Sequence, residues 1–120
     1  MIPQPQRWRL AGGRSLDLGR ARLLAIINVT PDSFSDGGEA LAPQAAAERA
    51  AQAVADGADM LDVGGESTRP GASRIDEPEQ IRRVVPAIRA IRAAGLDIPI
   101  SVDTTRAAVA RAALDAGADA

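Results

Sequence analysis

Three short polar segments carry most of the side chains that could bind a charged ligand. They lie at residues 28–38, 64–72 and 101–105, and each follows a short, mostly apolar run. Together they contain carboxylates, an amide, hydroxyls and a guanidinium, which can bind hydrogen-bond donors, cations and oxyanions. This combination predicts one ligand site assembled from segments that are far apart in the sequence.

Asp103 is the acidic residue best placed to recognise a ligand by hydrogen bonds. It ends the mostly apolar residues 98–102, and its carboxylate can accept two parallel N–H donors in a charge-assisted pair. The alternative is a structural role as an N-cap, since aspartate is a favoured cap and a helix is expected to follow.

Asn28 ends another apolar run and could act as a metal ligand. Its amide oxygen suits Mg²⁺, a hard cation that takes few protein ligands and completes its shell with water and substrate phosphate. The alternative is an Asx turn before Pro31, in which the side chain bonds the local backbone.

The composition excludes several kinds of chemistry. All 14 basic residues are arginine, and the 120 residues contain no Lys, His or Cys. A Schiff-base lysine, a histidine acid/base and a thiolate nucleophile are therefore absent from these residues. The formal net charge of −2 is too balanced to indicate a nucleic-acid or membrane surface.

We expect a cytoplasmic location. The absence of Cys fits a reducing compartment, and residues 1–9 lack the apolar centre of a secretory signal. No stretch approaches the roughly 18 apolar residues of a membrane span.

Apolar periodicity and turn residues predict the elements that position the polar segments. Residues 8–10 and 15–18 flank a Gly-rich turn and predict a β-hairpin. Apolar runs predict strands at 23–29, 60–63 and 98–103. Helices are expected at 43–56, from 77 until Gly95, and from a cap at Thr104 or Thr105 until Gly117.

The spacing of apolar residues also predicts which helix faces are buried. The expected inner positions are Ile81, Val84, Val85, Ile88 and Ile91 in the second helix and Val109, Ala112, Ala113 and Ala116 in the third. A repeated Gly-Ala-Asp, at residues 57–59 and 117–119, marks the end of a helix and the entry into the next strand.

Alternating strands and helices predict an α/β fold with a parallel sheet and right-handed crossovers. Long loops after strands and short ones after helices favour a (β/α)8 TIM barrel over a doubly wound sheet. A complete barrel takes about 250 residues. We therefore expect residues 1–120 to form one domain that is incomplete at its C-terminus, with the N-terminal hairpin, about three βα units and the start of a strand at 118–120. Barrel active sites lie at the C-terminal ends of strands, where the polar segments fall.

Taken together, these segments resemble the dihydropteroate synthase family. Residues 28–38 are similar to its first signature, residues 64–72 to its second, and residues 100–104 to the Ser-Val-Asp-Thr strand that follows. The resemblance covers the chain from Leu23 onward and implies a pterin-binding (β/α)8 barrel. Family members join 7,8-dihydropterin-6-ylmethyl diphosphate to p-aminobenzoate in folate biosynthesis, giving 7,8-dihydropteroate and diphosphate with the help of Mg²⁺. Sulfonamide drugs mimic p-aminobenzoate.

The resemblance implies a role for each matching residue. Asp103 corresponds to the carboxylate that binds the amino-pyrimidine edge of the pterin, and Asn28 to the amide beside the metal and diphosphate. Thr68 corresponds to the threonine that binds the pterin diphosphate.

Arg69 supplies a planar cation suited to the same oxyanion. Its alternative is a surface ion pair with Asp76 or Glu77. Ser67 and Pro70 are expected to shape the loop at residues 64–76, the second loop, which contains Thr68 and Arg69.

The loop at residues 30–39, the first loop, is expected to close over p-aminobenzoate. Phe34, the only Phe, lies in this polar loop and could cover the aromatic ring, with a small satellite core as the alternative. Asp32 is expected to orient the arylamine or hold Arg69, and Glu66 to have a structural role.

Two other functions stay open. The chain could be a pterin- or folate-binding module without synthase activity, either an inactive paralogue or a methyltransferase-type barrel, although the first loop argues against the latter. It could also be a fragment that binds nothing alone, since the family uses further residues from later strands. Full-length members of the family are expected to be homodimers.

Overall fold

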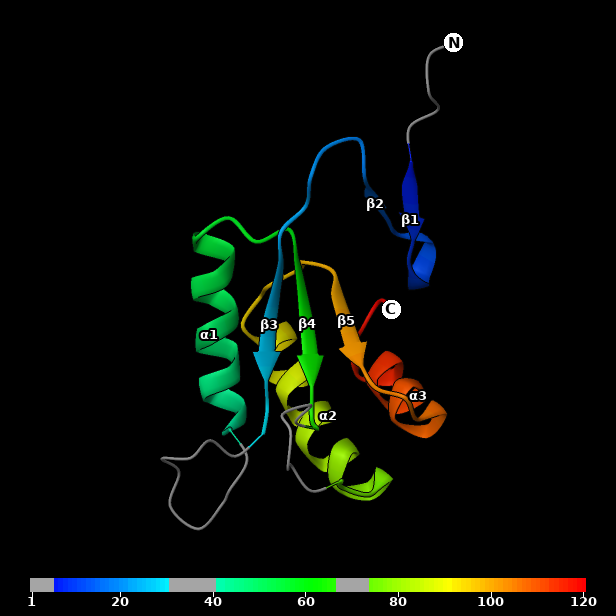
Figure 1. Cartoon of the computed structure of the whole chain (residues 1–120). Helices are drawn as coiled ribbons and strands as arrows, with labels where there is room; N and C mark the ends of the chain where they lie inside the picture. The colour runs from blue at the N-terminus through cyan, green and yellow to red at the C-terminus, as the bar shows by residue number, and fades with distance from the viewer. Residues whose placement is uncertain (1–5, 31–40, 67–73) are drawn as a thin grey trace.

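The computed structural model describes residues 6–30, 41–66 and 74–120. Its strands are β1 (Arg7–Arg9), β2 (Ser15–Asp17), β3 (Leu24–Asn28), β4 (Met60–Gly64) and β5 (Ile100–Asp103). Its helices are the short 3-10 turn η1 (Ala11–Gly13), α1 (Pro43–Ala55), α2 (Glu77–Ala93) and α3 (Ala107–Ala116). The expected order of hairpin, then alternating strands and helices, is confirmed, with bounds that differ by a few residues (Figure 1).

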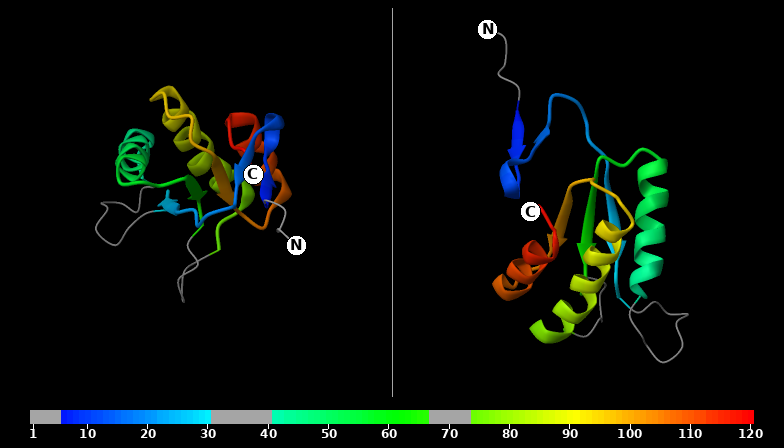
Figure 2. Two further views of the ribbon diagram at one scale, coloured as in Figure 1. Left: turned by 90° about the horizontal axis from the view of Figure 1, so that it is seen from above. Right: turned by 180° about the vertical axis from the view of Figure 1, so that it is seen from behind.

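A parallel sheet in the order β3-β4-β5 forms the centre of the chain. The three helices all cover one face of this sheet, and the other face carries no helix of the described residues (Figure 2). Beyond β5, the Asp119 N–H donates to the Ile100 carbonyl at 2.7 Å and Val102 N–H to the Ala120 carbonyl at 2.9 Å. Residues 118–120 therefore begin to pair with β5 as a fourth strand would, as expected.

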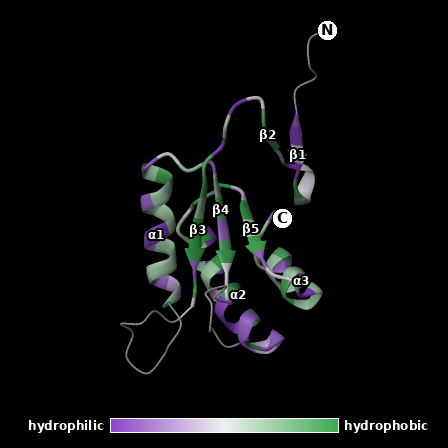
Figure 3. Cartoon of the chain, viewed as in Figure 1, coloured by the Kyte–Doolittle hydropathy of each residue, from purple (hydrophilic) through white to green (hydrophobic). Residues whose placement is uncertain are grey.

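The covered face of the sheet holds the core. Ile27, Leu61, Val63 and Ile100 are at most 3% exposed, and they pack against alanines of α1 and the apolar face of α2. Burying each such side chain contributes about 1.5–3 kcal/mol. Strands β3, β4 and β5 are largely hydrophobic in Figure 3, whereas the first turns of α2 are hydrophilic.

The opposite face presents the alternate residues of the same strands. Ile26 is 67% exposed and Leu24 49%, because successive strand residues point to opposite sides. In a (β/α)8 barrel this face is the interior.

The helix faces follow the apolar spacing only in part. Val84, Ile88 and Ile91 are buried as expected, while Ile81 and Val85 are half-buried. In α3, Val109 and Ala113 are buried, while Ala112 and Ala116 are half-buried.

The ends of the helices confirm three expectations and contradict one. Gly57, Gly95 and Gly117, which have φ of +105°, +84° and +120°, follow α1, α2 and α3 in the positive-φ region that glycine tolerates. The expected cap of the third helix at Thr104 or Thr105 is wrong. The N-cap residue of α3 is Arg106, and Thr104 Oγ1 instead accepts the Arg106 N–H at 3.1 Å in a turn before the helix.

The repeated Gly-Ala-Asp ties strands together at their N-terminal ends. Asp59 accepts the Leu23 N–H at 2.9 Å, and Asp119 accepts the Ile100 N–H at 2.9 Å. Each carboxylate also pairs with arginines: Asp59 with Arg20 and Arg22, and Asp119 with Arg14 and Arg92. The Leu23 N–H and then the arginines hold the pKa of Asp59 below its usual range, against the opposing effect of burial.

The Asp119 network also anchors the hairpin. Ala11 N–H donates to the Asp119 carbonyl at 2.8 Å, and Arg14 in the hairpin reaches the Asp119 carboxylate at 3.3 Å. The hairpin is thereby fixed at the end of the sheet opposite to the C-terminal ends of its strands (Figure 1).

Replacing Asp119 by Ala is expected to lower the free energy of unfolding by about 2–3 kcal/mol, because it leaves a buried backbone N–H and two guanidinium groups without this partner. Urea titration followed by circular dichroism measures the change. Asp97→Ala is the matched control, since the Asp97 side chain is 97% exposed and contacts the same Arg14. Asp97→Ala should lower the free energy of unfolding by less than about 0.5 kcal/mol. Equal losses of stability in both variants would contradict the role of Asp119 in holding β5 and the hairpin together.

Candidate active site

The C-terminal ends of β3, β4 and β5 lie side by side. Asn28 is the Cα partner of Gly64, and Gly64 is the partner of Asp103. The Val29 N–H donates to the Gly64 carbonyl at 2.9 Å and extends the ladder by one residue. Residues from three distant parts of the sequence therefore meet at one edge, on the uncovered face of the sheet.

Asp103 is exposed at this edge and lies against Gly64. A Cβ atom at Gly64 would come within 3.5 Å of Asp103 Cβ and 3.8 Å of its Oδ2. The alternative role of Asp103 as an N-cap is wrong, because α3 begins at Ala107 and its N-cap position is Arg106. The carboxylate is therefore exposed at the end of β5 and does not cap the helix.

Asp62 and Ser101 stand two positions before Gly64 and Asp103 in β4 and β5, so they face the same side of the sheet. They are Cα partners, and Ser101 Oγ donates to Asp62 Oδ1 at 2.6 Å. Burial raises the pKa of Asp62, the Ser101 hydroxyl partly offsets this, and the negative charge of Asp103 raises it further. Asp62 was not among the site residues predicted from the sequence, although a carboxylate in the middle of a short apolar strand can indicate a functional site.

The base of the second loop is held closely against α2. A Cβ at Gly65 would lie 3.0 Å from Val84 Cγ2 and 3.2 Å from the Gln80 carbonyl, so only glycine fits without displacement of the helix. Arg83 donates to the Gly65 carbonyl at 3.0 Å. Glu66 accepts the Ile75 N–H at 3.2 Å, which is a structural contact of the kind expected for it.

Several predicted site residues lie outside the described residues. These are Asp32, Phe34, Ser67, Thr68, Arg69 and Pro70. The acidic partners considered for Arg69 have other contacts: Asp76 caps α2 by accepting the Glu79 N–H at 3.0 Å, and Glu77 lies 3.8 Å from Arg106.

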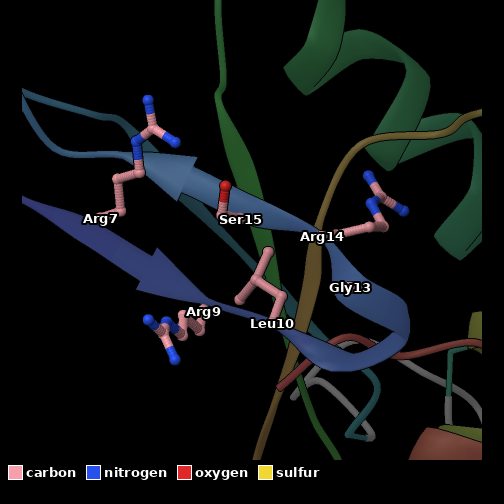
Figure 4. Close-up of a pocket in the computed structure, with 6 residues that line it drawn as sticks. All are labelled: Arg7, Arg9, Leu10, Gly13, Arg14 and Ser15. Carbon is pink, nitrogen blue, oxygen red and sulfur yellow. The ribbon is translucent and has the colours of Figure 1, made fainter.

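A hollow of about 560 Å³ lies on the hairpin, lined by Arg7, Arg9, Leu10, Gly13, Arg14 and Ser15. Figure 4 shows the guanidinium groups of Arg7, Arg9 and Arg14 pointing in different directions and not toward one centre. The hollow is also at the other end of the sheet from Asp103, so it is not the candidate site.

The described ranges, 6–30, 41–66 and 74–120, contain neither a cluster of metal-binding side chains nor a membrane-spanning helix. No group of three or more acidic, His or Cys residues there could hold a metal ion. No helix in those ranges is long and apolar enough to cross a membrane.

Comparison with known protein families gives a match over residues 24–120 to the family described as pterin binding enzyme. The chain belongs to this family. The strand ends described above fall within the matched residues.

Two relatives of this chain carry the name dihydropteroate synthase. The dihydropteroate synthase of Streptococcus pyogenes serotype M18 (strain MGAS8232) is 52% identical over 107 residues, covering 89% of this chain and 40% of that protein. The dihydropteroate synthase of Synechocystis sp. (strain ATCC 27184 / PCC 6803 / Kazusa) is 53% identical over 100 residues, covering 83% and 34%. The chain thus spans about two fifths of the length of the first of these relatives.

Solved structures show the same fold. Xanthomonas albilineans dihydropteroate synthase with 4-aminobenzoic acid superposes with a TM-score of 0.83 at 47% identity, covering 96% of this chain and 41% of that one. The Burkholderia cenocepacia enzyme complexed with 7,8-dihydropteroate gives 0.76 at 41% identity, covering 96% and 36%. The expected resemblance and the α/β barrel architecture, of which this chain forms a part, are confirmed.

The half-buried carboxyl of Asp62 predicts a particular pH dependence of stability. Because burial raises its pKa in the folded chain above the ordinary value of about 3.9, the folded state binds more protons than the unfolded state just above that value. Stability therefore falls as pH rises through this window. In Asp62→Asn, which keeps the acceptor for Ser101, the free energy of unfolding should rise relative to the wild type between about pH 4 and pH 7. Urea titrations at both pH values measure this difference. Asp97→Asn is the exposed control, and the same pH dependence in Asp62→Asn and the wild type would contradict the account.

Proposed function

We propose that this chain supplies the pterin-binding part of a dihydropteroate synthase. The reaction joins 7,8-dihydropterin-6-ylmethyl diphosphate to p-aminobenzoate and releases 7,8-dihydropteroate and diphosphate. The observation that carries the proposal is the row of Asn28, Gly64 and Asp103 at one strand edge, in a chain about half identical to proteins of that name. Residues 1–120 would belong to a single barrel domain.

Asp103 would recognise the pterin. An ionised carboxylate accepts two N–H donors from the amino-pyrimidine edge, and such charge-assisted pairs are about twice as strong as neutral ones. Glycine at position 64 leaves the space beside this carboxylate open for a flat ring. The exposure of Asp103 on the inner face of the sheet agrees with this role.

Asn28 would hold Mg²⁺ together with the substrate diphosphate. A single exposed amide at a strand end fits a cation that takes few protein ligands. When bound, Mg²⁺ supplies charge neutralisation to the leaving diphosphate. Thr68 would donate its hydroxyl to the same phosphate oxygens, and Arg69 would offer its planar guanidinium.

The first loop would hold the second substrate. Phe34 would cover the ring of p-aminobenzoate, and Asp32 would orient its amine or hold Arg69. Ser67 and Pro70 would shape the second loop beside it. The ligands of the Xanthomonas albilineans and Burkholderia cenocepacia relatives, 4-aminobenzoic acid and 7,8-dihydropteroate, support this pair of substrate and product.

The chemical step is a substitution at the pterin methylene carbon. The bond between this carbon and the diphosphate oxygen breaks, and its electron pair leaves with diphosphate. The amine nitrogen of p-aminobenzoate forms the new bond and then loses a proton to solvent. No protein nucleophile is needed, which agrees with the lack of Cys, His and Lys in these residues.

An alternative is a pterin-binding module without synthase activity. The chain spans only two fifths of its first relative, so we propose that turnover requires the remaining part of the barrel. The homodimer and the cytoplasmic location expected from the sequence stay predictions.

The test uses an assembled barrel, in which residues 1–120 of this chain are followed by the part of the Xanthomonas albilineans enzyme that the match leaves uncovered. We expect this barrel to form dihydropteroate from the two substrates. Asp103→Asn should lower kcat/KM by about 100-fold, because one of two charge-assisted hydrogen bonds is lost and the other weakened. Asp97→Asn, a surface change, should leave the rate unchanged.

Product formation is measured with radiolabelled p-aminobenzoate. A folded barrel that binds pterin without forming product would favour the module over the synthase. A folded barrel that binds no pterin would contradict the proposed function, as would an Asp103→Asn variant with the wild-type rate.

A further inference from the structure

Gln80 is a buried polar side chain on the otherwise apolar inner face of α2. It is 3% exposed, and the other buried residues of the helix are Val84, Ala87, Ile88 and Ile91. Burying an amide costs free energy unless its hydrogen bonds are made. The structure shows where those bonds go.

Both ends of the Gln80 amide are used. Its Nε2 donates to Glu66 Oε2 at 3.3 Å and to the Ile75 carbonyl at 3.1 Å. Its Oε1 accepts the Thr104 hydroxyl at 3.3 Å. The two amide hydrogens and one acceptor lone pair are thus satisfied within the chain.

The partners of Gln80 lie in two parts of the candidate site. Glu66 and Ile75 stand on either side of residues 67–73 and are themselves bonded to each other. Thr104 directly follows Asp103 and fixes the next turn through the Arg106 N–H. Gln80 therefore joins the base of the second loop to the end of β5.

We propose that Gln80 is a positioning residue that fixes the distance between Glu66 and Ile75, at the two ends of the second loop, and the carboxylate of Asp103. The inference rests on the proposed function, in which Asp103 binds the pterin ring and the second loop binds the diphosphate of the same molecule. A ligand that spans two binding parts gains affinity only when their separation is fixed to suit it. Gln80 thus increases the affinity for the whole substrate and not the affinity for the pterin ring or the diphosphate alone.

The link itself is tested by hydrogen exchange in the 120-residue chain. Gln80→Met keeps the length and volume of the side chain but removes all three hydrogen bonds. The amides of Ile75 and Arg106, which report on the two ends of the link, should both exchange at least ten times faster. The Leu61 amide, bonded to the Pro99 carbonyl at 2.9 Å in the sheet, reports on global opening.

Ile88→Val is the matched control, because it changes a buried residue of the same helix that has no part in the link. It should change the exchange of Ile75 and Arg106 no more than that of Leu61. The link is contradicted if Gln80→Met leaves the Ile75 and Arg106 amides as protected as in the wild type, or if only one end loosens.

The effect on the ligand is tested by calorimetry in the assembled barrel. Gln80→Met should bind 7,8-dihydropterin-6-ylmethyl diphosphate at least ten-fold more weakly. Binding of 6-hydroxymethyl-7,8-dihydropterin, which lacks the diphosphate, should stay within two-fold of the wild type. Ile88→Val should leave both affinities within two-fold.

The outcomes separate this inference from the proposed function. Equal losses for both ligands, or no loss for either, would overturn the positioning role, because only a fixed separation distinguishes the two ligands. If the wild-type barrel binds neither ligand, the proposed function fails and the positioning role fails with it. The hydrogen-exchange result would then still report whether Gln80 links the two segments.

Discussion

The parallel register of β3, β4 and β5 is the constraint on which the candidate site depends. Asn28, Gly64 and Asp103 share an edge only because each is the Cα partner of the next. Since strand side chains alternate between faces, a slip of β5 by one residue would turn Asp103 toward the helices and bring Val102 to the inner face. The packing that buries Ile27, Val63 and Ile100 under the helices therefore also orients Asp103.

The carboxylates at the two ends of the sheet have different bonding partners. At the N-terminal ends, Asp59 and Asp119 are held by arginines and by the backbone of neighbouring strands. At the C-terminal ends, no arginine of the described residues pairs with Asp62 or Asp103. The carboxylates that join strands through arginines and backbone N–H groups are thus separated from Asp62 and Asp103, which agrees with the separation of stability and activity at opposite ends of (β/α)8 barrels.

The sequence was sufficient to predict much of this arrangement. Continuous apolar runs located the strands, and glycines that must adopt positive φ located the ends of the helices. The strand ends then followed from the general geometry of parallel sheets. The repeat at residues 57–59 and 117–119 was visible in the sequence as a pattern. Its physical role, in which Asp59 and Asp119 bind backbone N–H groups of neighbouring strands, could be recognised only from the hydrogen bonds of the structure.

Other features could not be predicted from local patterns. The start of α3 was placed too early because Thr104 bonds the local backbone in a turn that competes with a helix cap. Asp62 and Gln80 were missed because their roles depend on partners 39 and 24 residues away. A strand covered by helices on one face and enclosed in a barrel on the other shows no clear alternation, so its inward residues cannot be identified from sequence alone.

The most direct test of the central claim is an NMR titration of the ¹⁵N-labelled chain with pterin-6-carboxylate. The account predicts shift changes at the amides of Gly64, Asp103 and their neighbours on the C-terminal edge of the sheet. It predicts none at Arg9 or Arg14 in the hairpin. Shift changes confined to the hairpin, or a folded chain whose strand-end amides do not respond, would contradict the assignment of this edge as the pterin site.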